Sequence, residues 1–325
     1  MISVAMCTYN GAKYLPEQLE SIIRQTQPVD ELVVCDDGST DNTLEVLRTF
    51  AQTAPFPVQI HQNPVNLGST KNFEQCLLRC RGEIIFLCDQ DDAWYDQKVA
   101  RTVAYLEAHP EKDAVFTNAR VMDGDSTTNG RTIWEEVEFI ETQQELWNQG
   151  RAHEILFKGF VATGATMAIR KRCLARLLPF PTHVRHLIHD AWITLALSLE
   201  NKIGFIPECL SNYRMHALQQ VGFGAKVEPV RLRDRLVRDR SRKLRPILEK
   251  AEELQGMYQL LREQPFVPQE KLAKLYSSQK HFEKRASLPA NRLLRIGPVL
   301  TDVLQGHYRF SSRHWWLPAL GDLFE

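Results

Sequence analysis

An apolar run followed directly by carboxylates lies at residues 84–92 of this sequence. Five apolar residues, Ile-Ile-Phe-Leu-Cys, precede Asp89, Asp91 and Asp92. Such a run is typical of a strand buried on both faces of a parallel sheet. Unpaired carboxylates are too costly to bury inside a strand, so we expect the three aspartates just past its C-terminal end. Open α/β sheets bind their ligands at that edge.

The spacing of these aspartates indicates a metal site. Asp89 and Asp91 are two positions apart, so in an extended chain their oxygens can turn toward one point. Mg²⁺ and Mn²⁺ prefer oxygen ligands, which carboxylates, water and phosphates supply together. The sequence therefore predicts a cation held by Asp91 and Asp89. A solvated acidic turn with helix-capping aspartates is the alternative interpretation.

Apolar strands alternate with helical periodicity over about the first 120 residues, which is typical of an α/β fold. We expect a mostly parallel sheet, flanked by helices and connected by right-handed crossovers. A further helix is expected at residues 189–199, and the chain beyond residue 224 is expected to be helical. Strands are predicted at residues 2–7, 32–35, 58–61, 84–88 and 114–117.

A second acidic turn, Asp36-Asp37, follows the strand at residues 32–35. The carboxylate of Asp36 can accept a hydrogen bond from the imide N–H of uracil or thymine. Turn chemistry before a helix is the alternative role. The glycine-rich dinucleotide motif and the phosphate loop are both absent, which argues against hydride transfer. A D-x-D motif without either loop points to a nucleoside diphosphate held through a cation, as in nucleotide-sugar chemistry.

Several motifs, in the correct order, resemble glycosyltransferase family 2. They lie at residues 3–10, 35–41 and 89–92. His189-Asp190-x-Trp192 and Tyr213-Arg214-x-His216 are similar to the bacterial branch of that family that is rich in rhamnosyltransferases. The resemblance covers roughly residues 1–225. It implies a GT-A fold, which is Rossmann-like, and an inverting, metal-dependent transfer of a sugar.

The resemblance also implies substrates. The donor would be a nucleoside-diphosphate sugar, with dTDP-L-rhamnose as the first candidate and a UDP-sugar as the second. The acceptor would be a saccharide, lipid-linked, in the synthesis of a surface polysaccharide such as O-antigen or capsule.

Roles for single residues follow from the same resemblance. Asp190 would be the catalytic base, whereas a first-turn acid at a helix N-terminus is its alternative. Asp91 and Asp89 would bind the metal ion. Arg214 and His216, in a loop, would close on the diphosphate, while Lys71 could reach a phosphate or simply begin a solvated helix. The residues expected to hold the donor are Thr8, Tyr9, Asp36, Asp37, Lys71, Asp89, Arg214 and His216.

The charge of the chain is uneven, although its 40 basic and 40 acidic residues cancel. Residues 226–313 hold 20 basic and 10 acidic residues. We therefore predict a catalytic domain at 1–225 and a basic helical region at 226–325. The catalytic domain would divide into a nucleotide-binding half at about 1–120 and an acceptor half at about 121–225.

The basic region has features of a membrane-surface segment. Residues 231–245 hold eight basic and two acidic residues, with leucines near one face, and the tail at 310–324 is rich in tryptophan and leucine. Such helices lie on anionic lipid. A helical subdomain that packs on the catalytic domain is the alternative. Nucleic-acid binding is not expected, because no recognised module accompanies the charge.

The remaining features indicate a cytoplasmic protein, and the basic region, if it binds lipid, would place it at the inner face of the membrane. None of the seven cysteines forms a C-x-x-C pair, which suits a reducing compartment. We see neither a signal peptide nor an apolar run of about 18 residues. Two other functions stay open: a catalytically silent nucleotide- or saccharide-binding scaffold, and a sugar nucleotidyltransferase. The latter would need a glycine-rich basic loop after the first strand, which is missing.

Overall fold

The computed structural model describes residues 1–216, 240–311 and 314–324. The chain divides into two compact units. The first, here called the sheet unit, comprises residues 1–152, 161–182 and 187–223. The second, the helical unit, comprises residues 153–160, 183–186 and 224–325. Two short segments of the predicted catalytic region thus belong with the C-terminal helices.

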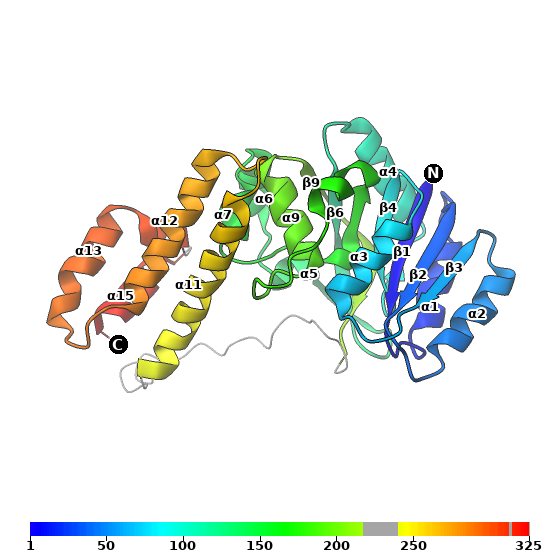
Figure 1. The fold of residues 1–325 in the computed structure, drawn as a ribbon, viewed down its shortest axis with the longest axis horizontal. Coiled ribbons are helices and arrows are strands. Elements are labelled where there is room, and N and C mark those ends of the chain that lie inside the picture. Colours follow the sequence, from blue (N-terminus) through cyan, green and yellow to red (C-terminus); the bar gives the residue numbers. More distant parts are fainter. Residues whose placement is uncertain (217–239, 312–313, 325) are drawn as a thin grey trace. The chain divides into compact units, whose positions relative to one another are not determined.

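The N-terminal half of the sheet is parallel, as the alternation of strands and helices predicts. Its four strands lie in the order β3-β2-β1-β4, and Figure 1 shows them in blue and cyan. The strands are β1 (Ile2–Thr8), β2 (Glu31–Asp36), β3 (Val58–Gln62) and β4 (Ile84–Asp89). The connecting helices are α1 (Leu15–Ile23), α2 (Thr43–Thr53) and α3 (Ser69–Arg79), and α4 (Lys98–Ala108) follows β4.

The second half of the sheet is mixed. β8 (Met167–Arg170) runs antiparallel between β4 and β6 (Ala114–Met122). β9 (Ile203–Arg214) pairs in parallel with β6, and β5 (Ala93–Trp94) and β7 (Thr128–Thr132) pair antiparallel with β9 and β6. The prediction that Arg214 lies in a loop is therefore wrong. A shifted register lets β9 continue to Arg214, which pairs with Met122.

Short elements cover the second half of the sheet. Residues 124–150, which show little periodicity in the sequence, contain aromatic side chains that are buried together. Trp134, Phe139 and Trp147 surround Phe116 of β6, with ring centroids 5.1–5.7 Å from its ring. The elements are α5 (Ile133–Glu136), α6 (Glu141–Asn148), η1 (Gly164–Thr166), η2 (Lys171–Cys173), α8 (Leu174–Leu177) and α9 (His189–Leu199).

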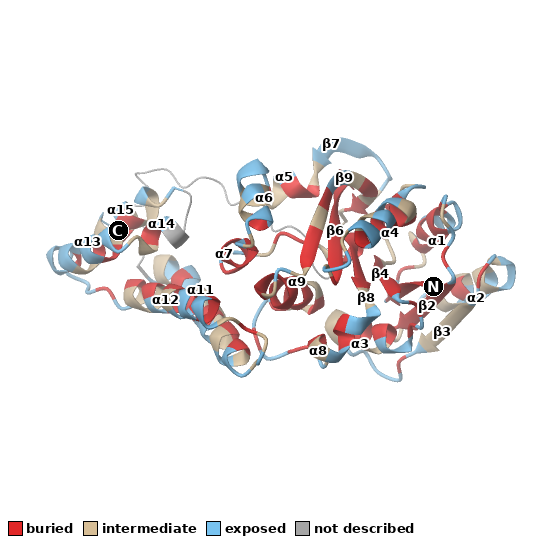
Figure 2. Cartoon of the chain, turned by 90° about the horizontal axis from the view of Figure 1, so that it is seen from above, coloured by how far each residue is buried: buried red, intermediate tan, exposed pale blue. Residues whose placement is uncertain are grey.

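The core of the sheet unit lies between the sheet and its helices, where buried residues concentrate (Figure 2). All residues of β1 and β2 are buried, as expected of strands covered on both faces. Trp94 and Trp192 are core residues, with 2% and 3% of their surface exposed. The observed α/β architecture confirms the predicted fold class.

The helical unit is built from packed helices with a small core of Leu288, Val299, Tyr308 and Ala319. Its helices α11 and α12 lie side by side (Figure 1). None of the described helices is both long and apolar enough to cross a membrane. The basic segment at 231–245 lies largely outside the described residues. The elements are α7 (Ala152–Leu156), α11 (Arg240–Arg262), α12 (Gln269–Ala286), η3 (Leu293–Arg295), α13 (Ile296–Leu304), α14 (His307–Ser311) and α15 (Trp316–Phe324).

Candidate active site

A cavity of about 160 Å³ lies at the carboxyl edge of the parallel strands. The sheet register explains its position, because Thr8 at the end of β1 pairs with Asp36, and Cys7 pairs with Asp89. The acidic turns after β2 and β4 therefore meet at one edge, as the sequence predicts. The predicted site residues that line the cavity are Thr8, Tyr9, Asp37, Asp89, Asp91, Asp190 and His216.

The turn after β2 is held by its own aspartates. Asp36 is fully buried, and its Oδ1 accepts hydrogen bonds from Thr8 Oγ1 at 2.9 Å and from Ser39 Oγ at 2.5 Å. Asp37 accepts hydrogen bonds from the backbone N–H groups of Leu67 and Gly68, both at 2.8 Å. Asp37 lines the cavity. Asp36 does not line it, but it accepts a hydrogen bond from Thr8, which does. The contact between Asp36 and a base stays a prediction.

Tyr9 and Gln90 join the first turn to the D-x-D turn. The Tyr9 backbone N–H donates to Gln90 Oε1 at 2.8 Å, and Gln90 Nε2 donates to the Tyr9 carbonyl at 3.0 Å. Gly11 leaves room for this amide, because a Cβ at residue 11 would lie 2.0 Å from Gln90 Oε1. We did not predict this role of Gln90. The sequence feature that could have indicated this contact is Gly11, the glycine of the first turn.

Asp91 and His216 form the part of the cavity that could hold a metal ion, and Asp89 lines the same cavity. His216 Nε2 lies 2.8 Å from Asp91 Oδ2, so both atoms can reach one cation. Burial, together with the charges of Asp91 and Asp190, raises the pKa of Asp89 to about 8. This concentration of negative charge is what a bound cation would neutralise. The carboxylates of this site fit Mn²⁺ or Mg²⁺, whereas the imidazole is a ligand more typical of Zn²⁺, Fe²⁺ or Ni²⁺.

Arg214 is fully buried, and its guanidinium contacts several protein groups. Nε donates to the Asp91 carbonyl at 2.6 Å, and Nη2 bonds Glu17 Oε2 at 2.5 Å. Nη1 donates to Ser126 Oγ at 2.9 Å. The Arg214 backbone N–H donates to Asp92 Oδ1 at 2.9 Å. The guanidinium and the backbone N–H of Arg214 therefore both hold the turn that carries the D-x-D motif. A direct contact with diphosphate would require the guanidinium to leave these partners.

Asp190 lies in the first turn of α9, as predicted, and its carboxylate lines the cavity. Its Oδ2 accepts a hydrogen bond from the backbone N–H of Gly164 at 2.8 Å. The neighbouring His189 stacks on Phe73 with ring centroids 4.2 Å apart, and burial lowers its pKa. The His189 ring is therefore neutral near pH 7 and packs as part of the wall.

Two lysines near the site have different surroundings. Lys71 Nζ bonds Glu74 Oε2 at 2.9 Å and is not among the residues that line the cavity. Lys98 is fully buried, with Nζ 2.7 Å from the Ala165 carbonyl and 4.4 Å from the ring centroid of Trp94. Lys98 therefore holds the short turn η1, which in turn positions Asp190 through Gly164.

Comparisons with known proteins agree with this architecture. The sequence matches the family described as "Glycosyl transferase family 2" over residues 3–178, more than half of the chain. An uncharacterized protein of Mycobacterium tuberculosis is 27% identical over 225 residues. That match covers 66% of this chain and 59% of the relative, so this chain spans well under two thirds of that protein's length.

Two solved structures share the fold. TarS of Staphylococcus aureus, residues 1–349, in complex with UDP-GlcNAc superposes with a TM-score of 0.55 at 16% identity, covering 99% of this chain and 90% of that chain. The mannosyltransferase PcManGT of Pyrobaculum calidifontis, in complex with GDP-Man and Mn²⁺, gives a TM-score of 0.53 at 20% identity, with coverages of 99% and 86%.

Proposed function

The chain belongs to glycosyl transferase family 2, and from this premise we propose that it transfers a sugar from a nucleoside-diphosphate sugar to a saccharide acceptor. The observation that carries the proposal is the cavity in which Asp91, His216 and Asp190 converge beside the ends of β1 and β4. This arrangement offers a cation site and a separate carboxylate. In the proposed mechanism the cation neutralises the leaving diphosphate, and the carboxylate takes the proton of the acceptor hydroxyl.

In the proposed reaction, Asp190 acts as the base. Its carboxylate takes the proton from the acceptor hydroxyl as that oxygen attacks the anomeric carbon, and attack opposite to the leaving diphosphate inverts the configuration. The N–H groups of Gly164 and Ala191 donate to Oδ2 and Oδ1 and so orient the carboxylate, and Asp190 lines the cavity. A divalent cation, when bound, would neutralise the charge that develops on the diphosphate.

The donor nucleotide is proposed from the resemblance rather than from pocket geometry. We infer a dTDP-sugar, with dTDP-L-rhamnose first and a UDP-sugar next. One fold neighbour is in complex with UDP-GlcNAc and the other with GDP-Man and Mn²⁺, which supports a nucleotide-sugar site that can include a cation. The acceptor is proposed to be a lipid-linked saccharide of surface-polysaccharide synthesis.

Calorimetry tests the nucleotide site. UDP, dTDP and GDP are titrated into the protein with and without Mn²⁺, and Asp91→Ala is titrated in parallel. We expect binding that depends on Mn²⁺ and that falls about tenfold or more in Asp91→Ala, because one charged ligand is lost. Preference for UDP over dTDP would keep the mechanism and change the donor. Failure of all three to bind would favour a silent scaffold.

A membrane contact is proposed for the helical unit. On α13, Leu300 and Leu304 are 51% and 87% exposed, and on α15, Trp316 and Phe324 are 49% and 55% exposed. These positions recur at helical spacing, and the two helices contact each other. We call this surface, which also includes Ile296 and Leu320, the α13–α15 apolar face. Such faces insert into the headgroup region of anionic membranes.

A further inference from the structure

The helical unit contains a cavity of its own, of about 310 Å³. We call it the lysine cavity. Within the described part of the chain, its lining includes no aspartate or glutamate. Its polar side chains come from α11, α12 and neighbouring segments, so residues far apart in the sequence converge on it. The side chains that matter for its chemistry are Lys158, Lys250, Lys274, Ser277, Ser278 and His281.

Lys250 and Lys274 can still donate hydrogen bonds to a ligand in the cavity. Lys250 Nζ bonds Glu253 at 2.7 Å, and Lys274 Nζ bonds Glu154 at 2.8 Å. An ammonium group has three N–H donors, so one carboxylate contact does not saturate it. Neither glutamate lines the cavity, and the charge presented to its interior is therefore positive.

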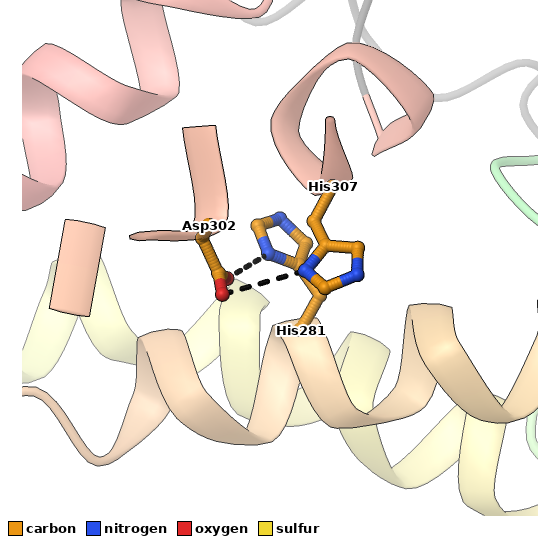
Figure 3. A group of neighbouring side chains, drawn as sticks. All are labelled: His281, Asp302 and His307. Carbon is orange, nitrogen blue, oxygen red and sulfur yellow. Dashed lines mark hydrogen bonds and ion pairs between the residues drawn. The ribbon is translucent and has the colours of Figure 1, made fainter. Parts of the chain in front are cut away.

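His281 adds an acceptor to this basic lining. Its Nδ1 lies 2.7 Å from Asp302 Oδ2 (Figure 3). Burial outweighs this contact and lowers the pKa of His281 to about 4, so the ring is neutral and Nδ1 carries the proton. Nε2 then has a free lone pair. It is buried and has no hydrogen-bond partner among the described residues. A buried acceptor of this kind calls for a donor from water or a ligand hydroxyl.

His281, Asp302 and His307 lie close enough together to suggest a cation site (Figure 3). Their charge argues against one. Asp302 Oδ1 already bonds Lys284 Nζ at 2.6 Å, and its other oxygen bonds His281. A divalent cation would have to displace Lys284 and would face the three lysines of the cavity. The surroundings therefore favour an anion.

We propose that the lysine cavity binds an organic phosphate, meaning a phosphoryl group carried on a small hydroxylated skeleton. Lys250 and Lys274 would meet the phosphoryl oxygens with charge-assisted hydrogen bonds. Nε2 of His281 would accept a hydrogen bond from a hydroxyl of the skeleton, while Phe157 and Phe282 cover its apolar side. A soluble polyol or sugar phosphate and a phospholipid headgroup share this chemistry. The proposal does not depend on the glycosyl transfer proposed above.

The test measures phosphate binding to the full chain by calorimetry. The soluble probes are glycerol 3-phosphate and inorganic phosphate, and phosphatidylglycerol vesicles are the lipid probe. The double variant Lys250→Gln/Lys274→Gln removes two charges and keeps polar side chains that are one atom shorter. Lys280→Gln is the matched control, because Lys280 also lies on α12 and bonds a glutamate, Glu283, but does not line the cavity.

We expect glycerol 3-phosphate to bind and its affinity to fall about tenfold or more in the double variant, while Lys280→Gln stays within about twofold. If only the vesicles bind, and the double variant no longer binds them, the proposal is supported and the phosphoryl group that the cavity recognises is that of a phospholipid headgroup. No binding of any probe would overturn it. So would an unchanged affinity for glycerol 3-phosphate in the double variant, vesicle binding that the double variant retains while neither soluble probe binds, or saturable binding of Zn²⁺ without phosphate.

His281→Asn tests the hydroxyl contact separately. The asparagine amide can still donate toward Asp302 but has no acceptor at the position of Nε2. We expect weaker binding of glycerol 3-phosphate with little change for inorganic phosphate. An unchanged affinity for glycerol 3-phosphate would overturn the assignment of the hydroxyl to His281. Thermal unfolding of each variant shows whether the unit is still folded.

Discussion

The carboxylates of the candidate active site differ in what surrounds them. Asp89 lies at the end of β4 near Asp91 and Asp190, where burial and neighbouring charge favour its protonated form. Asp91 is paired with His216, and Asp190 is held by the N–H of Gly164. In the proposed mechanism, Asp89 and Asp91 face a cation and Asp190 faces the acceptor.

Asp190→Asn tests the proposed base at the residue scale. The amide has almost the same shape but cannot take a proton from the acceptor hydroxyl. We therefore expect sugar transfer to fall by about 100-fold or more, as is typical for loss of a general base. Nucleotide affinity, measured by calorimetry, should change little, because the substitution leaves Asp91 and His216 intact. Transfer at the wild-type rate would refute the assignment of Asp190.

At the scale of elements, the short turn η1 links the core to the site. Lys98 of α4 bonds the Ala165 carbonyl in this turn, and Gly164 bonds Asp190 at the start of α9. Gly164 also has no room for a side chain. A Cβ there would lie 2.9 Å from His189 Nε2 and 3.3 Å from Asp190 Cβ. The position of Asp190 therefore depends on close packing between η1 and α9.

Gly164→Ala should displace α9 by a few tenths of an ångström and disturb Asp190. We expect sugar transfer to fall about tenfold or more, because small misplacement of a catalytic group is costly. Nucleotide binding should be retained. Gly159→Ala is the control, since a Cβ there would meet no atom within 4 Å. Equal transfer rates in the two variants would show that η1 does not position the base.

The packing of α12 against α13 and α14 predicts a dependence of stability on pH. His281 is buried with a pKa of about 4 in the folded protein, against about 6.5 for a histidine in an unfolded chain. The unfolded chain therefore binds more protons between these values, and stability falls as the pH is lowered through this window. Asp302, whose pKa is held below its usual value mainly by Lys284 against the effect of burial, loses its contribution only at lower pH.

Thermal unfolding between pH 7 and pH 4 measures this effect. The expected loss for His281 is at most about 3 kcal/mol, from about 1.4 kcal/mol for each pKa unit. His281→Asn should unfold with a smaller dependence on pH in this range, because asparagine does not titrate. The same pH dependence in both proteins would contradict a neutral, buried His281.

At the scale of the whole molecule, the α13–α15 apolar face predicts membrane binding by the intact protein. Leu300→Glu/Leu304→Glu places two charges on exposed positions of α13 and so should spare the fold. We expect co-flotation with phosphatidylglycerol vesicles to fall about tenfold or more, since burial of each leucine contributes about 1.5–3 kcal/mol.

Leu248→Glu is the matched control for this experiment, because Leu248 is 45% exposed on α11, outside the α13–α15 apolar face. It should float with the vesicles as the wild-type protein does. Flotation that persists in the double variant would show that this face does not carry the membrane contact.

Local sequence patterns determined several elements of this protein and the edge at which its site lies. The apolar runs predicted β1, β2 and β4, and helical periodicity predicted α9 at residues 189–199, because burial selects residues with the period of each element. Parallel pairing then brought the turns after β2 and β4 together. Most of the predicted site residues accordingly line one cavity.

Only the tertiary structure decided which side chains meet. Glu17 bonds Arg214 across 197 positions of the chain, Gln90 bonds Tyr9 across 81, and Lys98 bonds the Ala165 carbonyl across 67. The lysine cavity likewise assembles from separate segments between Phe157 and His307. Periodicity reports which face of an element is buried, but a hydrogen bond depends on where two elements pack, which the local sequence does not encode.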